Sequence, residues 1–324
     1  MENEILDLDL KDKKILFELD KNSRISITEL ARKVGVSKQV CQYRLSNLEN
    51  NKIILNYHTV PATYRFGKIA YKVYLKLHDI NEKKHQEIIN FLLKNKDVFW
   101  IGECHGKWDL IFGIWAKDME EFFNAHDKIL DKFSKFIQEK ELSVSRENIQ
   151  YNRKWLFSNP NEERKMFNFG EKEEPIKLND IDLKIIEILV SNSRTRIIDI
   201  AEKLNITAEV ASYRIKQLEK KYLIKGYKCL FNTKKLGYST NKAFVYFKNI
   251  TEQRRKEFLD YCKNHKNIIN IVITFAPWDL EIMFETKNYE EYFKIMEEIK
   301  NKFSDIIKFY ESILINKEPK QIFA

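Results

Sequence analysis

Glycine and proline are scarce in this chain, with 8 Gly and 5 Pro in 324 residues. This scarcity excludes a collagen-like, proline-rich or long flexible-linker protein. No GxGxxG or GxxxxGK[ST] segment is present, which argues against a glycine-rich nucleotide-binding enzyme. With so few breakers, the chain should consist mostly of short helices and strands joined by short turns.

Metal-binding spacings and long apolar runs are also missing. The four cysteines form no CxxC pair and the six histidines show no HExxH spacing. We therefore expect no metal, no cofactor and no disulfide framework. The acidic N-terminus does not resemble a signal peptide, and no apolar stretch is long enough for a membrane span. The sequence thus predicts a reduced, cytoplasmic protein without a membrane partner.

The chain does contain a long internal repeat. Residues 8–154 align with residues 178–324 without a gap, and 39 of these 147 positions are identical. Asn22-Ser23-Arg24, for example, matches Asn192-Ser193-Arg194. A period this long is not that of a solenoid and indicates one two-part unit that was duplicated and fused.

The first part of each unit has the pattern of a helix-turn-helix. Ser26 and Glu29 form a capping box that starts a short helix, and Gly35 suits the tight turn after it. Ser37 caps a third helix, for which we predict Val40, Cys41, Leu45 and Leu48 on the inner face. Two short helices joined by a tight turn are a helix-turn-helix. The second copy repeats it with Asn205 in place of the glycine, and segments 54–60 and 224–231 follow as extended wings.

The second part of each unit alternates strands and helices in the order β-α-β-β-α-β, the ferredoxin-like arrangement. We expect the last strand of this pattern over 136–144 in the first copy and 307–315 in the second. We therefore predict an α+β fold with two winged helix-turn-helix domains and two ferredoxin-like βαββαβ domains in tandem. The expected boundaries are 1–64 for the first helix-turn-helix domain, 65–150 for the first ferredoxin-like domain, 151–177 for a polar linker, 178–234 for the second helix-turn-helix domain and 235–324 for the second ferredoxin-like domain.

This combination resembles the Lrp/AsnC (feast/famine) transcription regulators. The resemblance rests on residues 8–19, Asn22-Ser23-Arg24, the Ser37–Glu49 helix, Ile54 with Tyr57, and Gly106-Lys107-Trp108-Asp109. It implies DNA binding by the first part of each unit and subunit pairing by the second. It also implies a small-molecule effector, such as an amino acid, near the Gly-x-x-Asp turn, with Gly106, Trp108 and Asp109 as its binding residues. This chain departs from the family in carrying two units and in reading Ala276-Pro277-Trp278-Asp279 at the second turn.

Double-stranded DNA is the main partner that the residues themselves predict. Amide side chains at the start of a recognition helix suit adenine edges, while basic and hydroxyl groups suit phosphates. The predicted DNA-binding residues are Ser37, Lys38, Gln39, Gln42, Tyr43, Arg44 and Asn47 in the first copy and Thr207, Ser212, Tyr213, Arg214, Lys216 and Gln217 in the second. Because the two sets differ, we expect a target that is not a strict palindrome.

Net charge is a weaker argument for DNA binding. The chain has a formal charge of +9, but the two helix-turn-helix regions carry only part of it, which predicts modest, salt-dependent affinity. The densest basic cluster lies at the end of the second recognition helix and its wing, where we expect backbone contacts. Its members are Lys216, Lys220, Lys221, Lys225 and Lys228.

Two other readings of the sequence stay open. One is an architectural DNA-binding protein with little sequence preference. The other is an enzyme like the sirohaem decarboxylases, which share the two-part architecture but carry a His- and Arg-rich stretch around the central strands. Here that region, 103–108, contains no arginine. We therefore predict a regulator without enzymatic activity, whose two ferredoxin-like domains pair as an internal pseudo-dimer, with further homo-oligomer formation through the remaining sheet surfaces.

Overall fold

The computed structural model describes residues 5–157, 164–170 and 175–321. The first unit contains α1 (Leu10–Lys21), α2 (Ile27–Val34), α3 (Lys38–Asn50), β1 (Ile54–Pro61), β2 (Ile69–Leu77), α4 (Glu82–Lys94), β3 (Val98–Gly106), β4 (Leu110–Ala116), α5 (Met119–Phe133), β5 (Ile137–Tyr151) and β6 (Met166–Phe169). The second unit contains α6 (Asp180–Ser191), α7 (Ile197–Leu204), α8 (Ala208–Lys220), β7 (Ile224–Phe231), β8 (Ser239–Phe247), α9 (Glu252–Asn264), β9 (Ile268–Phe275), β10 (Leu280–Thr286), α10 (Tyr289–Lys302) and β11 (Ile307–Gln321). These elements confirm the predicted fold class, with two helix-turn-helix domains and two ferredoxin-like domains.

Local sequence explains where the helix-turn-helix elements begin and end. The Ser26 side chain accepts a hydrogen bond from the Glu29 backbone N–H at 3.2 Å and caps α2. Gly35 ends that helix in the left-handed region, with φ 74°. In the second copy Asn205 does the same with φ 53°, because asparagine tolerates this conformation better than other non-glycine residues.

The two ferredoxin-like sheets join into one closed sheet. Its strand order is β2-β4-β3-β11-β8-β10-β9-β5-β6, and β5 also pairs with β2. Eight strands therefore form an antiparallel barrel, with β6 added to β5 outside the ring. The edge strand of each copy pairs with the other copy, β3 with β11 and β9 with β5, so neither copy leaves those edges unpaired.

This pairing lengthens two strands beyond the sequence-based expectation. Segments 136–144 and 307–315 were predicted as strands, whereas β5 and β11 continue to Tyr151 and Gln321. The added residues lie mostly opposite the other copy's strand, so no pattern within one unit marks them.

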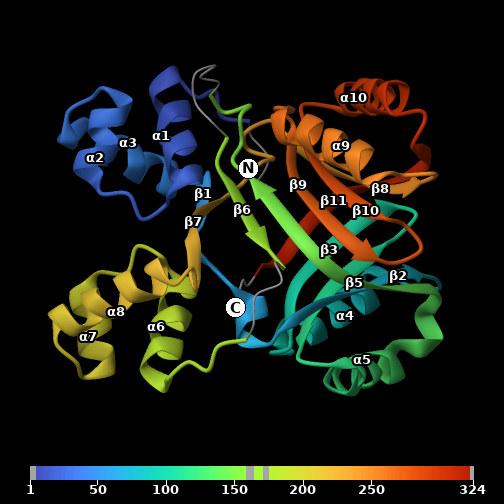
Figure 1. Ribbon diagram of the computed structural model, residues 1–324, viewed down its shortest axis with the longest axis horizontal. Coiled ribbons are helices and arrows are strands. Elements are labelled where there is room, and N and C mark those ends of the chain that lie inside the picture. The colour runs from blue at the N-terminus through green and yellow to red at the C-terminus, as the bar shows by residue number, and fades with distance from the viewer. Residues whose placement is uncertain (1–4, 158–163, 171–174, 322–324) are drawn as a thin grey trace.

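The helices cover the outside of the barrel. In Figure 1, α9 and α10 lie above the barrel and α4 and α5 below it, while the two helix-turn-helix domains stack at the left. Each helix pair packs its own apolar core against the outer face of its copy's strands. A separate cluster fills one end of the barrel interior around Tyr74, Trp108, Phe244 and Trp278, with the Tyr74 and Trp278 rings 4.8 Å apart. The barrel is therefore closed by aromatic side chains at that end.

The two helix-turn-helix domains are fixed to each other. The segments predicted as wings, β1 and β7, pair with one another as an antiparallel ribbon in which His58 lies opposite Lys228. The repeated Asn-Ser-Arg motifs meet beside this ribbon. The Ser23 and Ser193 hydroxyl groups are 2.7 Å apart and buried. Arg24 donates to the carbonyl of Ser193, and Arg194 donates to that of Ser23 at 2.8 Å.

The described part of the predicted linker packs against both copies. Arg153 forms ion pairs with Asp20 and Glu285, each at 2.8 Å. The Trp155 ring stacks on Tyr238 with 3.8 Å between the ring centroids. This segment is thus not a free connection, because its charged and aromatic side chains join a helix-turn-helix domain to the barrel. Residues 158–163 and 171–174 of the predicted linker lie outside the described residues.

Candidate functional site

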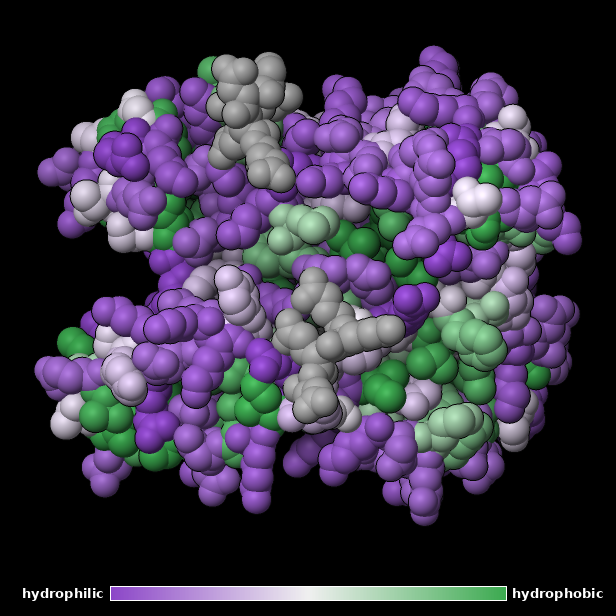
Figure 2. Space-filling model, in the orientation of Figure 1, coloured by the Kyte–Doolittle hydropathy of each residue, from purple (hydrophilic) through white to green (hydrophobic). Residues whose placement is uncertain are grey.

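The recognition helices α3 and α8 each begin with a capped, exposed turn. Ser37 and Thr207 accept hydrogen bonds from the backbone N–H groups of Val40 and Val210, at 3.2 and 3.3 Å. Figure 2 shows mainly hydrophilic side chains over both helix-turn-helix domains, with a notch between the two domains at their outer side. Of the predicted DNA-binding residues, the exposed ones are Ser37, Lys38, Gln39, Gln42, Tyr43, Thr207, Tyr213 and Lys216, and the half-buried ones are Arg44, Asn47, Ser212, Arg214 and Gln217.

Two of the predicted DNA-binding arginines form ion pairs within the protein. Arg44 pairs with Asp9 at 2.7 Å and with Asp12 at 2.9 Å, both of which belong to the start of α1. Arg214 pairs with Asp182 of α6 at 3.0 Å. These arginines tie each recognition helix to the first helix of its domain, so their charge is largely used within the fold.

Two further expectations need correction. Val40 was predicted to face inward, but it is 43% exposed, and Val210 at the same place in the second copy is 40% exposed. They lie on the outer side of the recognition helix, where an apolar side chain can contact a thymine methyl group. Lys228 was predicted to contact the DNA backbone, but it is buried and donates to the Tyr151 carbonyl at 3.3 Å. The ribbon turns this lysine toward the barrel instead of the surface.

The Gly-x-x-Asp turn between β3 and β4 is held by structural contacts. Gly106 has φ +123°, and a Cβ there would lie 2.9 Å from the Ser312 carbonyl oxygen. Trp108 points into the barrel core and is 1% exposed. Asp109 accepts from the Leu77 backbone N–H at 2.8 Å, and Asp279 does the same for Phe247 at 2.7 Å. The turn thus has a structural role in both copies, and the effector site predicted there remains a prediction.

A buried cluster of charged groups lies inside the barrel, and sequence analysis missed it. Lys72 and Lys242 both donate to Glu281, at 2.8 and 2.7 Å. Tyr74 donates to the other carboxylate oxygen of Glu281. Burial raises the pKa of the Glu281 carboxyl, but the two ammonium groups outweigh it and lower that pKa to about 2. Burial lowers the pKa of Lys72 to about 8.

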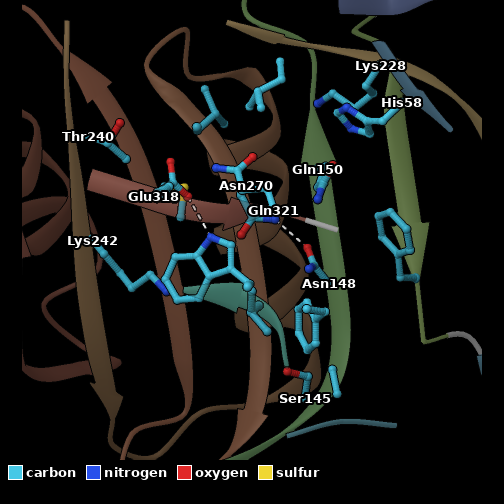
Figure 3. Close-up of a pocket in the computed structure, with 18 of the residues that line it drawn as sticks. His58, Ser145, Asn148, Gln150, Lys228, Thr240, Lys242, Asn270, Glu318 and Gln321 are labelled. Atoms are coloured by element: carbon cyan, nitrogen blue, oxygen red, sulfur yellow. Dashed lines mark hydrogen bonds between the residues drawn. The ribbon is translucent and has the colours of Figure 1, made fainter. Parts of the chain in front are cut away.

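Beyond these lysines the barrel opens into a cavity of about 180 Å³, which the barrel strands and the β1–β7 ribbon enclose. Its wall includes Lys72 from the barrel interior. Figure 3 shows Lys242, also from the barrel, together with His58 and Lys228 from the ribbon. Burial, with help from Lys228 and Arg153, lowers the pKa of His58 to about 3, so its ring is neutral near pH 7. Sequence could have flagged this site, because Lys72 and Lys242 occupy the same place in two apolar strands.

The fold and the helix-turn-helix geometry define the class of protein, and the comparisons agree. A family profile described as "Winged helix-turn-helix DNA-binding" matches residues 8–54 and 178–225. The chain is 30% identical over 118 residues to a proline dehydrogenase transcriptional activator of Rhodobacter capsulatus, covering 36% of this chain and 75% of the relative. The corresponding protein of Rhizobium radiobacter is 34% identical over 121 residues, with coverage of 36% and 75%. The chain belongs to the Lrp/AsnC family of transcription regulators.

A solved structure corrects one expectation. The crystal structure of the siroheme decarboxylase NirDL matches 96% of this chain and 93% of its own, with a TM-score of 0.64 and 14% identity. The sequence-based prediction that the chain has no enzymatic activity is contradicted by this match, because an enzyme is built on the same paired arrangement of domains. At this identity the likeness shows the fold alone. Within the described residues no helix is long and apolar enough to cross a membrane.

Proposed function

We propose that this protein is a sequence-specific, DNA-binding transcription regulator that presents two different recognition helices from one chain. The observation that carries the proposal is the fixed pairing of the two helix-turn-helix domains. The β1–β7 ribbon and the reciprocal contacts of Arg24 and Arg194 hold α3 and α8 at one separation. Paired helix-turn-helix proteins read two half-sites whose spacing matches the separation of their recognition helices.

The two helices carry different chemistry at their exposed starts. In α3, Lys38 and Gln39 are exposed, whereas the second copy has Ala208 and Glu209 at these places. Gln39 suits an adenine edge, and Glu209 can accept from the amino group of cytosine but repels phosphate. The proposal therefore includes unlike half-sites, with phosphate contacts from Lys38 on one side and from the exposed Lys216, Lys220 and Lys221 on the other.

Selection from a random duplex pool, followed by titration, tests this proposal. Specific binding should exceed binding to random duplexes by at least about 1,000-fold. The joint variant Lys38→Ala/Gln39→Ala should lower the affinity for DNA and relax the sequence preference at one half-site only. Lys216→Ala should lower the affinity for all duplex sequences alike and reduce the salt dependence of binding by about one phosphate contact. Lys83→Ala, an exposed lysine on α4, is the matched control and should change neither.

Two outcomes of this titration would count against the proposal. Equal affinity for selected and random duplexes would favour an architectural DNA-binding protein. Unchanged affinity in both recognition-helix variants would reject α3 and α8 as the DNA-contacting elements. The remaining parts of the proposal are a cytoplasmic location, modulation by an amino acid or another small metabolite, and further self-association of the chain, which light scattering measures directly.

A further inference from the structure

The cavity at the open end of the barrel has polar groups at both ends. Figure 3 shows Ser145 at one end and Lys228 with His58 at the other, with Asn148 and Gln150 along the β5 wall between them. Its volume of about 180 Å³ is slightly larger than the ~150 Å³ of a cavity that holds benzene. It is smaller than the ~300–1,000 Å³ of pockets that hold drug-sized ligands. A single small molecule therefore fits.

The end formed by β4 and β5 offers hydrogen-bond donors without partners. The Ser145 hydroxyl and the indole N–H of Trp115 are both buried, and neither has a hydrogen-bond partner in the described part of the chain. Ser145 is only 4% exposed. A buried polar group without a partner leaves its desolvation uncompensated, so a ligand that supplies an acceptor oxygen here recovers part of that cost.

The opposite end offers a cation. Lys228 donates to the Tyr151 carbonyl at 3.3 Å, and no carboxylate pairs with it among the described residues. Burial lowers the pKa of Lys228 to about 8, which still leaves the ammonium form dominant at pH 7. Its neighbour across the ribbon, His58, is neutral. An ammonium group with remaining donor capacity in a buried wall favours an anionic ligand.

The carboxyl groups near the cavity are engaged within the protein. Glu318, which lines the cavity, accepts a hydrogen bond from the Trp100 indole N–H at 2.8 Å, and burial raises the pKa of its carboxyl. Arg153 already uses the carboxylates of Asp20 and Glu285, and Glu281 serves both barrel lysines. Between the two ends, the walls combine polar side chains, such as Asn148 and Asn270, with an aromatic and apolar surface. Phe99 stacks on Trp115 with 4.2 Å between the ring centroids, and Phe169, Phe231 and Met283 complete this surface.

We propose that this cavity binds a small organic carboxylate with an aromatic body, whose carboxylate contacts Lys228 and whose second oxygen contacts Ser145 and Trp115. The site lies at the end of the barrel away from the Gly-x-x-Asp turn, because Trp108 and Trp278 fill the barrel at the turn end. The binding proposal does not depend on DNA binding, so it is measured on the full-length protein without DNA.

Isothermal titration calorimetry with three ligands of one shape tests the charge preference. The ligands are 4-hydroxyphenylacetate, its neutral amide 4-hydroxyphenylacetamide, and the cation tyramine, each up to roughly 10 mM, above the millimolar limit of weak binding. The carboxylate should bind at least tenfold more tightly than the amide, and tyramine should not bind. Equal binding of all three, or no heat from any of them, would overturn the proposal.

Variants then place the ligand in the cavity. Lys228→Met should weaken binding of the carboxylate by tenfold or more, the ratio expected for a lost hydrogen bond to a charged group, and should remove its advantage over the amide. Ser145→Ala should weaken the carboxylate and the amide alike, and Ala70→Phe should block the cavity, because Ala70 lines it. Lys83→Met is the matched control.

Folding of each variant is checked by circular dichroism. If Lys228→Met does not fold, Ser145→Ala and Ala70→Phe decide the matter. Undiminished carboxylate binding in both of these variants would reject this cavity as the site.

Discussion

The single carboxylate between two barrel lysines makes Glu281→Ile a decisive perturbation. The first copy has Ile111 at the place of Glu281, so the substitution gives the two copies the same side chain there. Lys72 and Lys242 would then be buried without an ion-paired carboxylate in the described part of the chain, since both of their ion pairs there are with Glu281. Removing one partner of a buried ion pair typically costs about 3–5 kcal/mol, and here a single substitution leaves two ammonium groups unpaired.

The expected loss is therefore at least about 3 kcal/mol at pH 7, measured by urea unfolding followed by tryptophan fluorescence. The triple variant with Lys72→Met and Lys242→Met should recover most of this loss, because replacing a whole buried ionic network by apolar side chains is often neutral or stabilising. A cost below about 1 kcal/mol for Glu281→Ile, or a triple variant no more stable than the single one, would refute the reasoning.

The same cluster predicts how stability depends on pH. Burial lowers the pKa of Lys72 to about 8 in the folded protein, whereas an unfolded lysine has a pKa of about 10.4. Between these values the unfolded chain binds more protons than the folded one, so this group makes stability rise with pH in that window. In Glu281→Ile, the Lys72 ammonium group loses the carboxylate that raises its pKa, so its folded pKa falls further and the variant begins to gain stability at a lower pH than the parent protein. The deficit of Glu281→Ile should therefore shrink as the pH rises from 7 to about 8, and a deficit that grows instead would contradict this assignment.

Three further results are expected. Gly106→Ala should lower the free energy of unfolding by roughly 2 kcal/mol or more, and Gly67→Ala by about 1 kcal/mol, in urea unfolding. The difference is expected because an added Cβ meets the Ser312 carbonyl oxygen at position 106, whereas nothing lies within 4 Å of it at position 67. Equal losses in the two variants would contradict this. Arg24→Ala with Arg194→Ala should weaken binding to a duplex with two half-sites more than to one half-site, and an unchanged two-site affinity would speak against the fixed pairing. Separate halves, divided between β6 and α6, should form a 1:1 complex on mixing in light scattering, because a homodimer of the first half would bury two lysines without Glu281. Persisting homodimers would disprove this.

Much of the fold was predictable because it is encoded locally. The Ser26 and Ser37 caps, the left-handed Gly35 and Asn205, and the period-2 strands each depend on a few neighbouring residues. The repeat then assigned the same elements to the second copy. What local patterns could not give was the pairing between the copies, namely the barrel closure and the β1–β7 ribbon.

The site was less predictable for the same reason. Outward residues of α3, such as Lys38 and Gln39, follow from helical periodicity and are exposed as expected. Arg44 has the same periodicity, but its contact with α1 depends on how two helices pack. Lys228 was read as part of a basic surface cluster, because no sequence pattern shows that its strand turns toward the barrel.

Fusion of the two copies explains why the cavity can be asymmetric. In a symmetric dimer, a residue near the two-fold axis faces a copy of itself, so a pocket there has two equivalent ends. Here residues at matching places differ: His58 lies opposite Lys228 in the ribbon, and Glu285 stands in the second copy where Trp115 stands in the first. One end of the cavity thus carries an ammonium group and the other a hydroxyl and an indole N–H. An unsymmetric ligand can bind there in a single orientation, which two identical chains could not enforce.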